Sequence, residues 1–197
     1  MLRKNVKSFY QWCIENNKQR YIDLWDYELN NKTPKEVAAS DSINKYYFKC
    51  EKGIHESFLK GINNLINSKD LICPRCNSFY QWCIDNDRMD YVEAWDFSEN
   101  TVDIYTVSKG SAQKAWFKYP YYSYFYPLSY IVRNGRDDGP DKKYYNSLGY
   151  YIINKYGPDA IERYWSNKND KSPFEYDRGS SLYVWFKCVK KDYHDDY

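Results

Sequence analysis

Apolar residues recur at helical spacing near the start of the chain and again 70 positions later. Three of them lie at i, i+3 and i+4, on one face of a helix: Phe9, Trp12 and Cys13. Ser8 and Gln11 fit the S-x-x-Q capping box that begins such a helix. The segment SFYQWCIENN at residues 8–17 returns as SFYQWCIDND at residues 78–87. We therefore predict a capped amphipathic helix at both places.

A second short helix and three strands are expected from the remaining pattern. Ile22, Trp25 and Leu29 lie at i, i+3 and i+7, which predicts a helix over residues 22–29 that ends at Asn30. Segments rich in aromatic and other β-forming residues predict strands at these places: residues 46–49, 115–119 and 183–187. Short helices mixed with short strands predict an α+β fold.

An internal repeat sets the predicted organisation of the chain. Trp25, Trp95 and Trp165 follow one another at steps of 70 residues. The triplets that begin at Phe48, Phe117 and Phe186 follow at steps of 69. Three divergent units therefore account for the chain, with these boundaries: residues 1–76, 77–146 and 147–197.

Four potential metal ligands lie at intervals typical of a structural zinc site. Cys50 and His55 form a Cys-x4-His pair, and Cys73-Pro-Arg-Cys76 follows after seventeen intervening residues. Three thiolates and one imidazole complete a tetrahedron and leave no position for water. We expect the first pair on a tight turn and the second pair at the entry to the helix capped by Ser78. The alternative is that the cysteines are buried apolar thiols and His55 is a surface residue.

The other cysteines have two interpretations each. Cys13 and Cys83 occupy matching places on the two repeated helices, as small core residues or as reactive thiols. Cys188 and His194 are either half of a metal site that another molecule completes, or relics of a full site. The first 20 residues lack the apolar stretch of a secretory signal, so we expect a cytoplasmic protein without disulfides.

Composition limits the classes of function. The chain has 197 residues, 20% of them aromatic, and a mean hydropathy of −0.90, so it is expected to fold and to bind no membrane. The formal net charge is +2 and the pI is about 8.0, below the values above about 9 that are typical of duplex-DNA binders. Residues 1–76 carry 13 basic and 9 acidic side chains, while residues 77–146 carry 8 and 10.

A tyrosine-rich segment in the second predicted unit is the candidate for partner binding. The residues of this predicted face are Tyr121, Tyr122, Tyr124, Tyr126, Arg133 and Arg136. Tyrosine brings contact area with few rotamers to freeze, which favours a protein partner, and it also stacks on unpaired bases. The alternative is that these rings form a core that replaces the missing metal.

Catalysis is not expected. The chain has two histidines, both at metal-type positions, and it lacks G-x-S-x-G, P-loop and H-E-x-x-H motifs.

The motifs around the four ligands resemble a known family. They run in this order: Trp25-Asp26, Asn30, Pro34, the aromatic segment ending in Lys49-Cys50, Gly53-Ile54-His55 and Cys73-Pro74-Arg75-Cys76. This pattern resembles the zinc-ribbon or treble-clef repeat domains of bacteria and phages. The resemblance implies treble-clef-like units and one structural Zn²⁺ in the first unit only, since Tyr119 stands at the place of Cys50 in the second.

Two functions follow from this resemblance. More loosely, the chain is similar to small phage-encoded, zinc-containing anti-CRISPR proteins. That similarity implies a non-enzymatic inhibitor that binds a host defence nuclease such as a type II CRISPR effector. The alternative is a nucleic-acid-binding zinc-finger module that accompanies a nuclease. Steep salt dependence would distinguish nucleic-acid binding from a protein interface.

Overall fold

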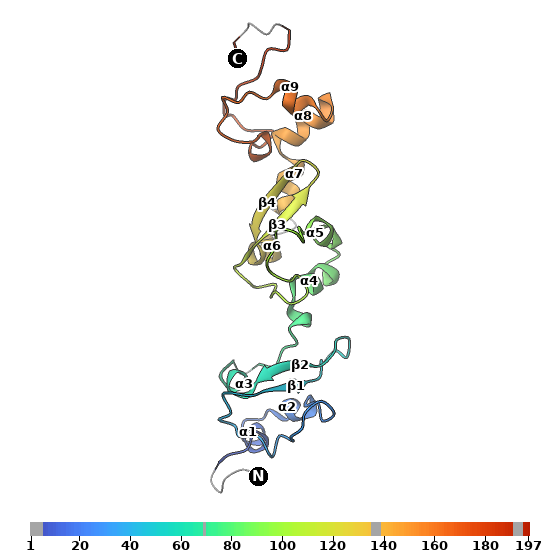
Figure 1. The fold of residues 1–197 in the computed structure, drawn as a ribbon, viewed down its shortest axis with the longest axis vertical. Coiled ribbons are helices and arrows are strands. Elements are labelled where there is room, and N and C mark those ends of the chain that lie inside the picture. Colours follow the sequence, from blue (N-terminus) through green and yellow to red (C-terminus); the bar gives the residue numbers. More distant parts are fainter. Residues whose placement is uncertain (1–5, 69, 135–138, 191–194) are drawn as a thin grey trace. The chain divides into compact units, whose positions relative to one another are not determined.

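The computed structural model describes residues 6–68, 70–134, 139–190 and 195–197 (Figure 1). Two compact bodies are formed. The N-terminal body runs up to Gln81 and includes Ile104–Ser108, and the C-terminal body comprises Trp82–Asp103 and the chain from Lys109 onward. Short helices and two-stranded antiparallel sheets make up both bodies, which confirms the predicted α+β class. The three sequence boundaries stay a prediction.

The N-terminal body is built around one hairpin. Its elements are α1 (Phe9–Glu15), α2 (Gln19–Asp23), β1 (Lys45–Phe48), β2 (Phe58–Gly61), α3 (Ile62–Ser68) and the 3-10 turn η1 (Arg75–Asn77). β1 pairs with β2 from Lys45↔Gly61 to Phe48↔Phe58. Figure 1 shows α1 and α2 on one side of this pair.

Aromatic rings from the helices and β1 meet in the core of this body. The Trp25 ring lies 5.3 Å from Phe48, 5.0 Å from Tyr46 and 5.9 Å from Phe9, measured between centroids. The capping box of α1 forms as predicted, because the Ser8 hydroxyl accepts from the Gln11 N–H and the Gln11 side chain accepts from the Ser8 N–H. The capping box fixes the start of α1, and the Phe9 ring packs the helix against Trp25 and Phe48.

The core interpretation of the paired helix cysteines is confirmed. Cys13 on α1 and Cys83 on α4 (Phe79–Asp85) are fully buried. Burial raises the pKa of both thiols to about 12, which leaves them protonated and unreactive near neutral pH.

The second helix is shorter than expected, and the prediction of residues 22–29 is wrong at its end. α2 stops at Asp23, and Trp25 forms a β-bridge with Phe48 instead of a helical turn. The Asp26 carboxylate accepts hydrogen bonds from the N–H groups of Glu28 and Leu29, at 3.0 and 3.1 Å. Such a local turn competes with helix continuation, and it leaves the Leu29 side chain 54% exposed.

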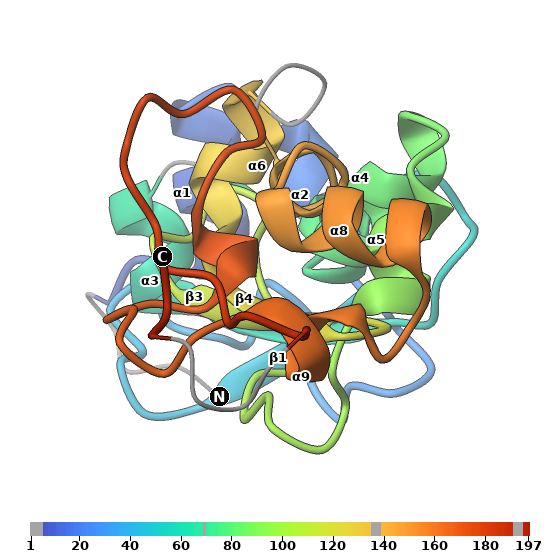
Figure 2. The ribbon, with the colours of Figure 1, turned by 90° about the horizontal axis from the view of Figure 1, so that it is seen from above.

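The C-terminal body repeats this mixture of elements. They are α5 (Met89–Ala94), β3 (Lys114–Tyr119), β4 (Tyr122–Pro127), α6 (Leu128–Asn134), α7 (Pro140–Tyr145), α8 (Leu148–Tyr156), α9 (Ala160–Tyr164) and the 3-10 turn η2 (Pro173–Glu175). β3 confirms the strand predicted at 115–119 and pairs antiparallel with β4. α8 contacts both α9 and η2, and Figure 2 labels α8 and α9. No described helix is long and apolar enough to cross a membrane.

The strand predicted at residues 183–187 does not form. Only a bridge from Trp165 to Phe186 is present there, and the Phe186 backbone exchanges two hydrogen bonds with Tyr197. A strand needs a neighbour of several residues to satisfy its backbone, as β2 provides for β1. Within the described part of the chain no segment provides one here, and Tyr183 is fully exposed.

Isolated backbone bridges recur at the spacing of the sequence repeat, in two sets of three. One set joins the residue before each long helix to a later loop: Ser8↔Ala38, Ser78↔Ser108 and Ser147↔Asp177. The other joins a tryptophan to a phenylalanine: Trp25↔Phe48, Trp95↔Phe117 and Trp165↔Phe186.

Candidate zinc centre and neighbouring pocket

The first pair of ligands lies on the turn that follows β1. Cys50 is two residues beyond the end of β1, and the Gly53 N–H donates to the Cys50 carbonyl at 2.9 Å. Gly53 has a φ of +67°, a left-handed conformation in which glycine avoids the strain of a Cβ. This tight turn brings His55 back towards the Cys50 sulfur.

The second pair lies on the turn that begins η1. The Asn77 N–H donates to the Cys73 carbonyl at 3.2 Å, which wraps the chain around Cys73 and Cys76. Leu71, two residues before Cys73, is 2% exposed in the aromatic core and fixes the approach of this segment. The Ser78 hydroxyl then accepts from the Gln81 N–H at the first turn of α4.

The four predicted ligands meet at one point. Their ligand atoms all lie within 4.8 Å of one another, and they form the one such cluster among the described residues. The His55 Nδ1 atom lies 3.7, 3.7 and 3.3 Å from the sulfurs of Cys50, Cys73 and Cys76. The Cys50 and Cys76 sulfurs are 3.4 Å apart.

These distances fit a tetrahedral zinc ion. Zinc bonds of about 2.3 Å to sulfur and about 2.0 Å to nitrogen put two sulfur ligands about 3.8 Å apart, and a sulfur and a nitrogen about 3.5 Å apart. The cysteines are free thiols rather than disulfides, so each can supply a thiolate. Four protein ligands fill the tetrahedron, which is the arrangement of a structural rather than a catalytic zinc site.

A cation among the ligands would allow all three thiols to ionise. Burial raises the pKa of the Cys50 thiol, but hydrogen bonds from Cys76, from His55 and from the Lys52 N–H outweigh it and hold that pKa below its ordinary value. Burial and the neighbouring Cys50 and Cys73 sulfurs raise the pKa of Cys76. Three thiols at this spacing cannot all ionise unless a positive ion lies among them.

Arg20 links the two halves of the centre, a role that the sequence pattern does not indicate. Its guanidinium donates two hydrogen bonds of 2.6 Å to the Glu51 carboxylate, next to Cys50. It also donates at 3.1 Å to the carbonyl of Leu71, which lies just before Cys73. Since Glu51 and Leu71 are 31 and 51 residues away, no local spacing could have identified this contact.

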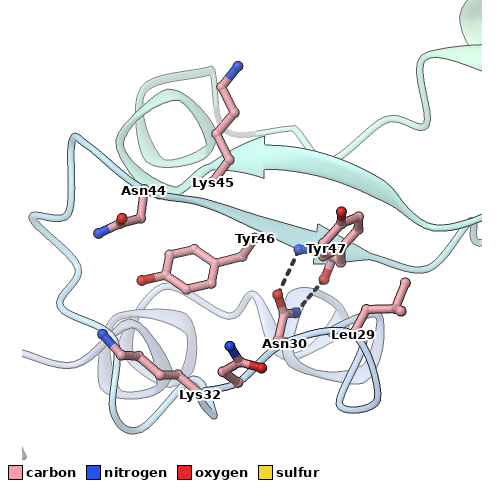
Figure 3. Close-up of a pocket in the computed structure, with 8 residues that line it drawn as sticks. Leu29, Asn30, Lys32, Asn44, Lys45, Tyr46 and Tyr47 are labelled. Carbon is pink, nitrogen blue, oxygen red and sulfur yellow. Dashed lines mark hydrogen bonds between the residues drawn. The ribbon is translucent and has the colours of Figure 1, made fainter.

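A polar pocket of about 290 Å³ lies beside β1 in the same body (Figure 3). Its lining contains two lysines and no acidic residue: Leu29, Asn30, Asn31, Lys32, Asn44, Lys45, Tyr46 and Tyr47. The Asn30 amide accepts from the Tyr47 N–H at 2.9 Å and donates to the Tyr47 carbonyl at 2.8 Å, as Figure 3 shows. In the sequence Asn30 marks the end of a helix and belongs to the family pattern, and neither role indicates this backbone contact.

The residues of the predicted partner face lie in different environments. Tyr124 is 5% exposed and its hydroxyl donates to the Phe174 carbonyl at 2.8 Å, so its place in a partner face is wrong and the core interpretation holds for it. Tyr122 and Tyr126 are half-buried against the same core, while Tyr121 is exposed. Arg133 is exposed at the end of α6.

Two predicted site residues lie outside the described residues. These are Arg136, of the partner face, and His194, which the sequence pairs with Cys188. Cys188 itself is half-buried.

The comparisons with known proteins agree with this geometry. Residues 21–78 match a family model described as a probable treble-clef zinc finger domain. No curated protein and no solved structure matches the chain. The matched segment contains all four ligands of the cluster. Residues 21–78 thus form a treble-clef zinc finger domain, in which Cys50, His55, Cys73 and Cys76 hold one structural Zn²⁺.

Proposed function

We propose that the chain is a non-enzymatic, zinc-finger-type module and that it binds nucleic acid. When bound, the zinc ion supplies folding free energy rather than a reactive water, because its four protein ligands complete the coordination shell. Cys50 and His55 hold one arm of the site, and Cys73 and Cys76 hold the other. The ligand is then expected on the surface that this zinc orders.

The charge of the pocket beside β1 carries the proposal. Lys32 and Lys45 line it together with three asparagines, and no carboxylate belongs to its lining. The lysine ammonium groups are donors to phosphate oxygens and to base edges, whereas the amides of Asn30 and Asn44 already donate to the Tyr47 carbonyl and to Asp41. The excess of basic residues in the chain also lies in residues 1–76, which contain the zinc site.

A protein-binding inhibitor is less well supported by the surface. The inhibitor prediction rests in part on the tyrosine-rich segment, where Tyr124 is buried and Tyr122 and Tyr126 are half-buried against the same core. Inhibition of a host defence nuclease, including a type II CRISPR effector, stays a prediction that rests on resemblance.

We also propose that the three predicted units are divergent copies of one domain. The two sets of recurring bridges support this proposal, because they join equivalent residues at the spacing of the sequence repeat.

Binding should be measured by fluorescence anisotropy with labelled oligonucleotides at about 50 and 200 mM salt. We expect affinity to fall steeply with salt, and Lys32→Ala and Lys45→Ala each to reduce the salt slope by about one. Lys35→Ala is the charge-matched control, because Lys35 packs over the Tyr10 ring and does not line the pocket. A wild-type chain that binds no oligonucleotide at the lower salt would refute the proposal.

A further inference from the structure

We infer that the nucleic acid is single-stranded and that its unpaired bases stack on three equivalent rings, those of Tyr47, Trp116 and Trp185. We call these the strand rings. The inference rests on the proposed function and adds to it the class of nucleic acid and the residues that contact its bases.

The backbone at each strand ring is held by an asparagine side chain. Trp116 donates its N–H to Asn100 at 2.7 Å and accepts from the same amide at 2.9 Å. Trp185 makes the same two contacts with Asn169, at 2.9 and 2.8 Å. Tyr47 does so with Asn30, as described above. Two hydrogen bonds from one planar amide fix the position from which each ring projects.

These contacts occupy backbone groups that an added peptide strand would need. The carbonyls of Tyr47 and Trp116 also accept the N–H groups of Asp26 and Asp96, both at 3.1 Å. The Trp185 carbonyl accepts from the Ser166 N–H at 3.2 Å. A peptide that adds itself to a sheet needs free N–H and C=O groups at the edge. At these three positions the chain therefore offers a ligand its side chain, not its backbone.

At each of the three positions, an apolar side chain of the ring or of its neighbour is about half exposed. Trp185 is 48% exposed. Trp116 stacks on Phe125, its cross-strand partner, with centroids 4.7 Å apart, and Phe125 is also 48% exposed. Tyr47 lies opposite Leu59, whose exposure is again 48%. Flat rings of this kind are the platforms on which successive bases stack in proteins that bind single strands.

Each platform has a lysine beside it, which makes nucleic acid a better ligand than an apolar protein surface. Lys45 is two residues before Tyr47 on β1, so both side chains project from the same face. The Lys114 ammonium lies 5.6 Å from the Phe125 centroid, and the Lys168 ammonium lies 5.2 Å from the Trp185 centroid. These two ammonium groups lie over the ring faces, and an ammonium that a stacking base moves to its edge can contact the phosphate.

Paired bases cannot use these platforms, because their faces are already stacked inside the duplex. This explains how a chain with a net charge of only +2 could bind nucleic acid, since stacking supplies affinity that a small charge does not. The expected preference is therefore for single strands over duplexes.

Affinity and stacking should be measured together with (dT)12 and a 12-base-pair duplex. We expect wild-type protein to bind (dT)12 at least about tenfold more tightly than the duplex, with quenching of tryptophan fluorescence. Trp116→Ala and Trp185→Ala should each weaken (dT)12 binding by about tenfold, and Trp185→Phe, which keeps a ring, should retain most of the affinity. Circular dichroism spectra would verify that each variant is folded.

Tyr156→Ala is the matched control. Tyr156 is 47% exposed and has a lysine ammonium 5.0 Å from its ring, like Trp185, but it lies on α8 rather than on an asparagine-held strand position. Its replacement should leave (dT)12 affinity unchanged.

The outcomes separate this inference from the proposed function. Equal affinity for duplex and single strand, or an equal loss in Tyr156→Ala and Trp185→Ala, overturns the stacking inference and leaves nucleic-acid binding in place. Unchanged (dT)12 affinity in both tryptophan-to-alanine variants also overturns it and leaves nucleic-acid binding at other residues. Absence of binding to either oligonucleotide refutes both proposals.

Discussion

Removal of the zinc ion should unfold the N-terminal body and leave the C-terminal body folded. Apart from the zinc ion, Arg20 joins the two ligand turns through its contacts with Glu51 and the Leu71 carbonyl. The Arg20–Glu51 ion pair is exposed and contributes little stability. Without the ion, three buried or half-buried thiols would lie around one imidazole within 4.8 Å. Protonation or separation of these groups would pull Leu71 away from the core that it helps to close.

The size of the effect follows from binding linkage. Structural zinc sites in zinc-finger peptides bind with about 10–16 kcal/mol at pH 7, and a nanomolar dissociation constant corresponds to about 12 kcal/mol. At a free zinc concentration about 1,000 times that constant, the ion stabilises the folded state by about 4 kcal/mol. Domains of this size lose about 4–8 °C in Tm per kcal/mol, so a chelator should lower the Tm of this body by about 15–30 °C.

Hydrogen exchange measured by mass spectrometry tests this prediction body by body. Addition of a chelator should speed exchange in β1 (Lys45–Phe48), while β3 (Lys114–Tyr119) serves as an internal control within the same molecule. Cys76→Ser should reproduce the effect without a chelator, and Cys188→Ser should keep one zinc per chain. The reasoning fails if the protein is shown to be metal-free and β1 exchange and the Tm are the same as before chelation.

Three further predictions concern single contacts. Asn30→Ala removes both hydrogen bonds between the Asn30 amide and the Tyr47 backbone, and it should lower the free energy of unfolding by about 1–3 kcal/mol, measured in urea. Burial raises the pKa of Asp41, but hydrogen bonds to its carboxylate outweigh this and hold it at about 2. The ionised Asp41 therefore stabilises the folded state fully above its unfolded pKa of about 3.9, and this stabilisation is lost as the pH falls towards 2. Asp41→Asn should remove the loss of stability between about pH 4 and 2 in an acid unfolding curve. A Cβ at Gly149 would lie 2.8 Å from the Phe174 ring, so Gly149→Ala should cost about 1–3 kcal/mol, whereas Gly179→Ala meets nothing within 4 Å and should be neutral.

Local patterns predicted the zinc centre well. The four ligands belong to two short turns whose geometry is set within four to six residues, so spacing alone indicates which atoms converge. The capping box at Ser8 is equally local, since its partner is three residues away. β1 and β3 were predictable because each has a partner that follows closely along the chain.

Features that depend on distant or competing contacts were not predictable from the pattern. The end of α2 is set by Asp26, whose carboxylate binds two backbone N–H groups where the apolar spacing favoured another helical turn. The segment 183–187 has strand-forming residues, but propensity cannot supply the missing neighbour. Composition likewise could not decide whether Tyr124 is buried, because that depends on Phe174, 50 residues further on.

Under the proposal that the predicted units are divergent copies of one domain, we expect buried rings to take the place of the metal in the second unit. Tyr119 stands where the first unit has Cys50, and its ring stacks on Tyr144 with centroids 4.9 Å apart and planes 14° apart. Tyr144 stacks in turn on Phe174 at 5.6 Å, and Tyr124 binds the Phe174 carbonyl. The three buried rings of this cluster, Tyr124, Tyr144 and Phe174, remove about 450–750 Å² from water. This is worth roughly 11–19 kcal/mol before entropy costs, which is close to the binding free energy of a structural zinc ion. Tyr119 and Phe174 belong to the same ring cluster and are 55 residues apart, so this cluster forms only when the chain as far as η2 is folded. The zinc site, in contrast, is complete at Cys76, 26 residues after Cys50.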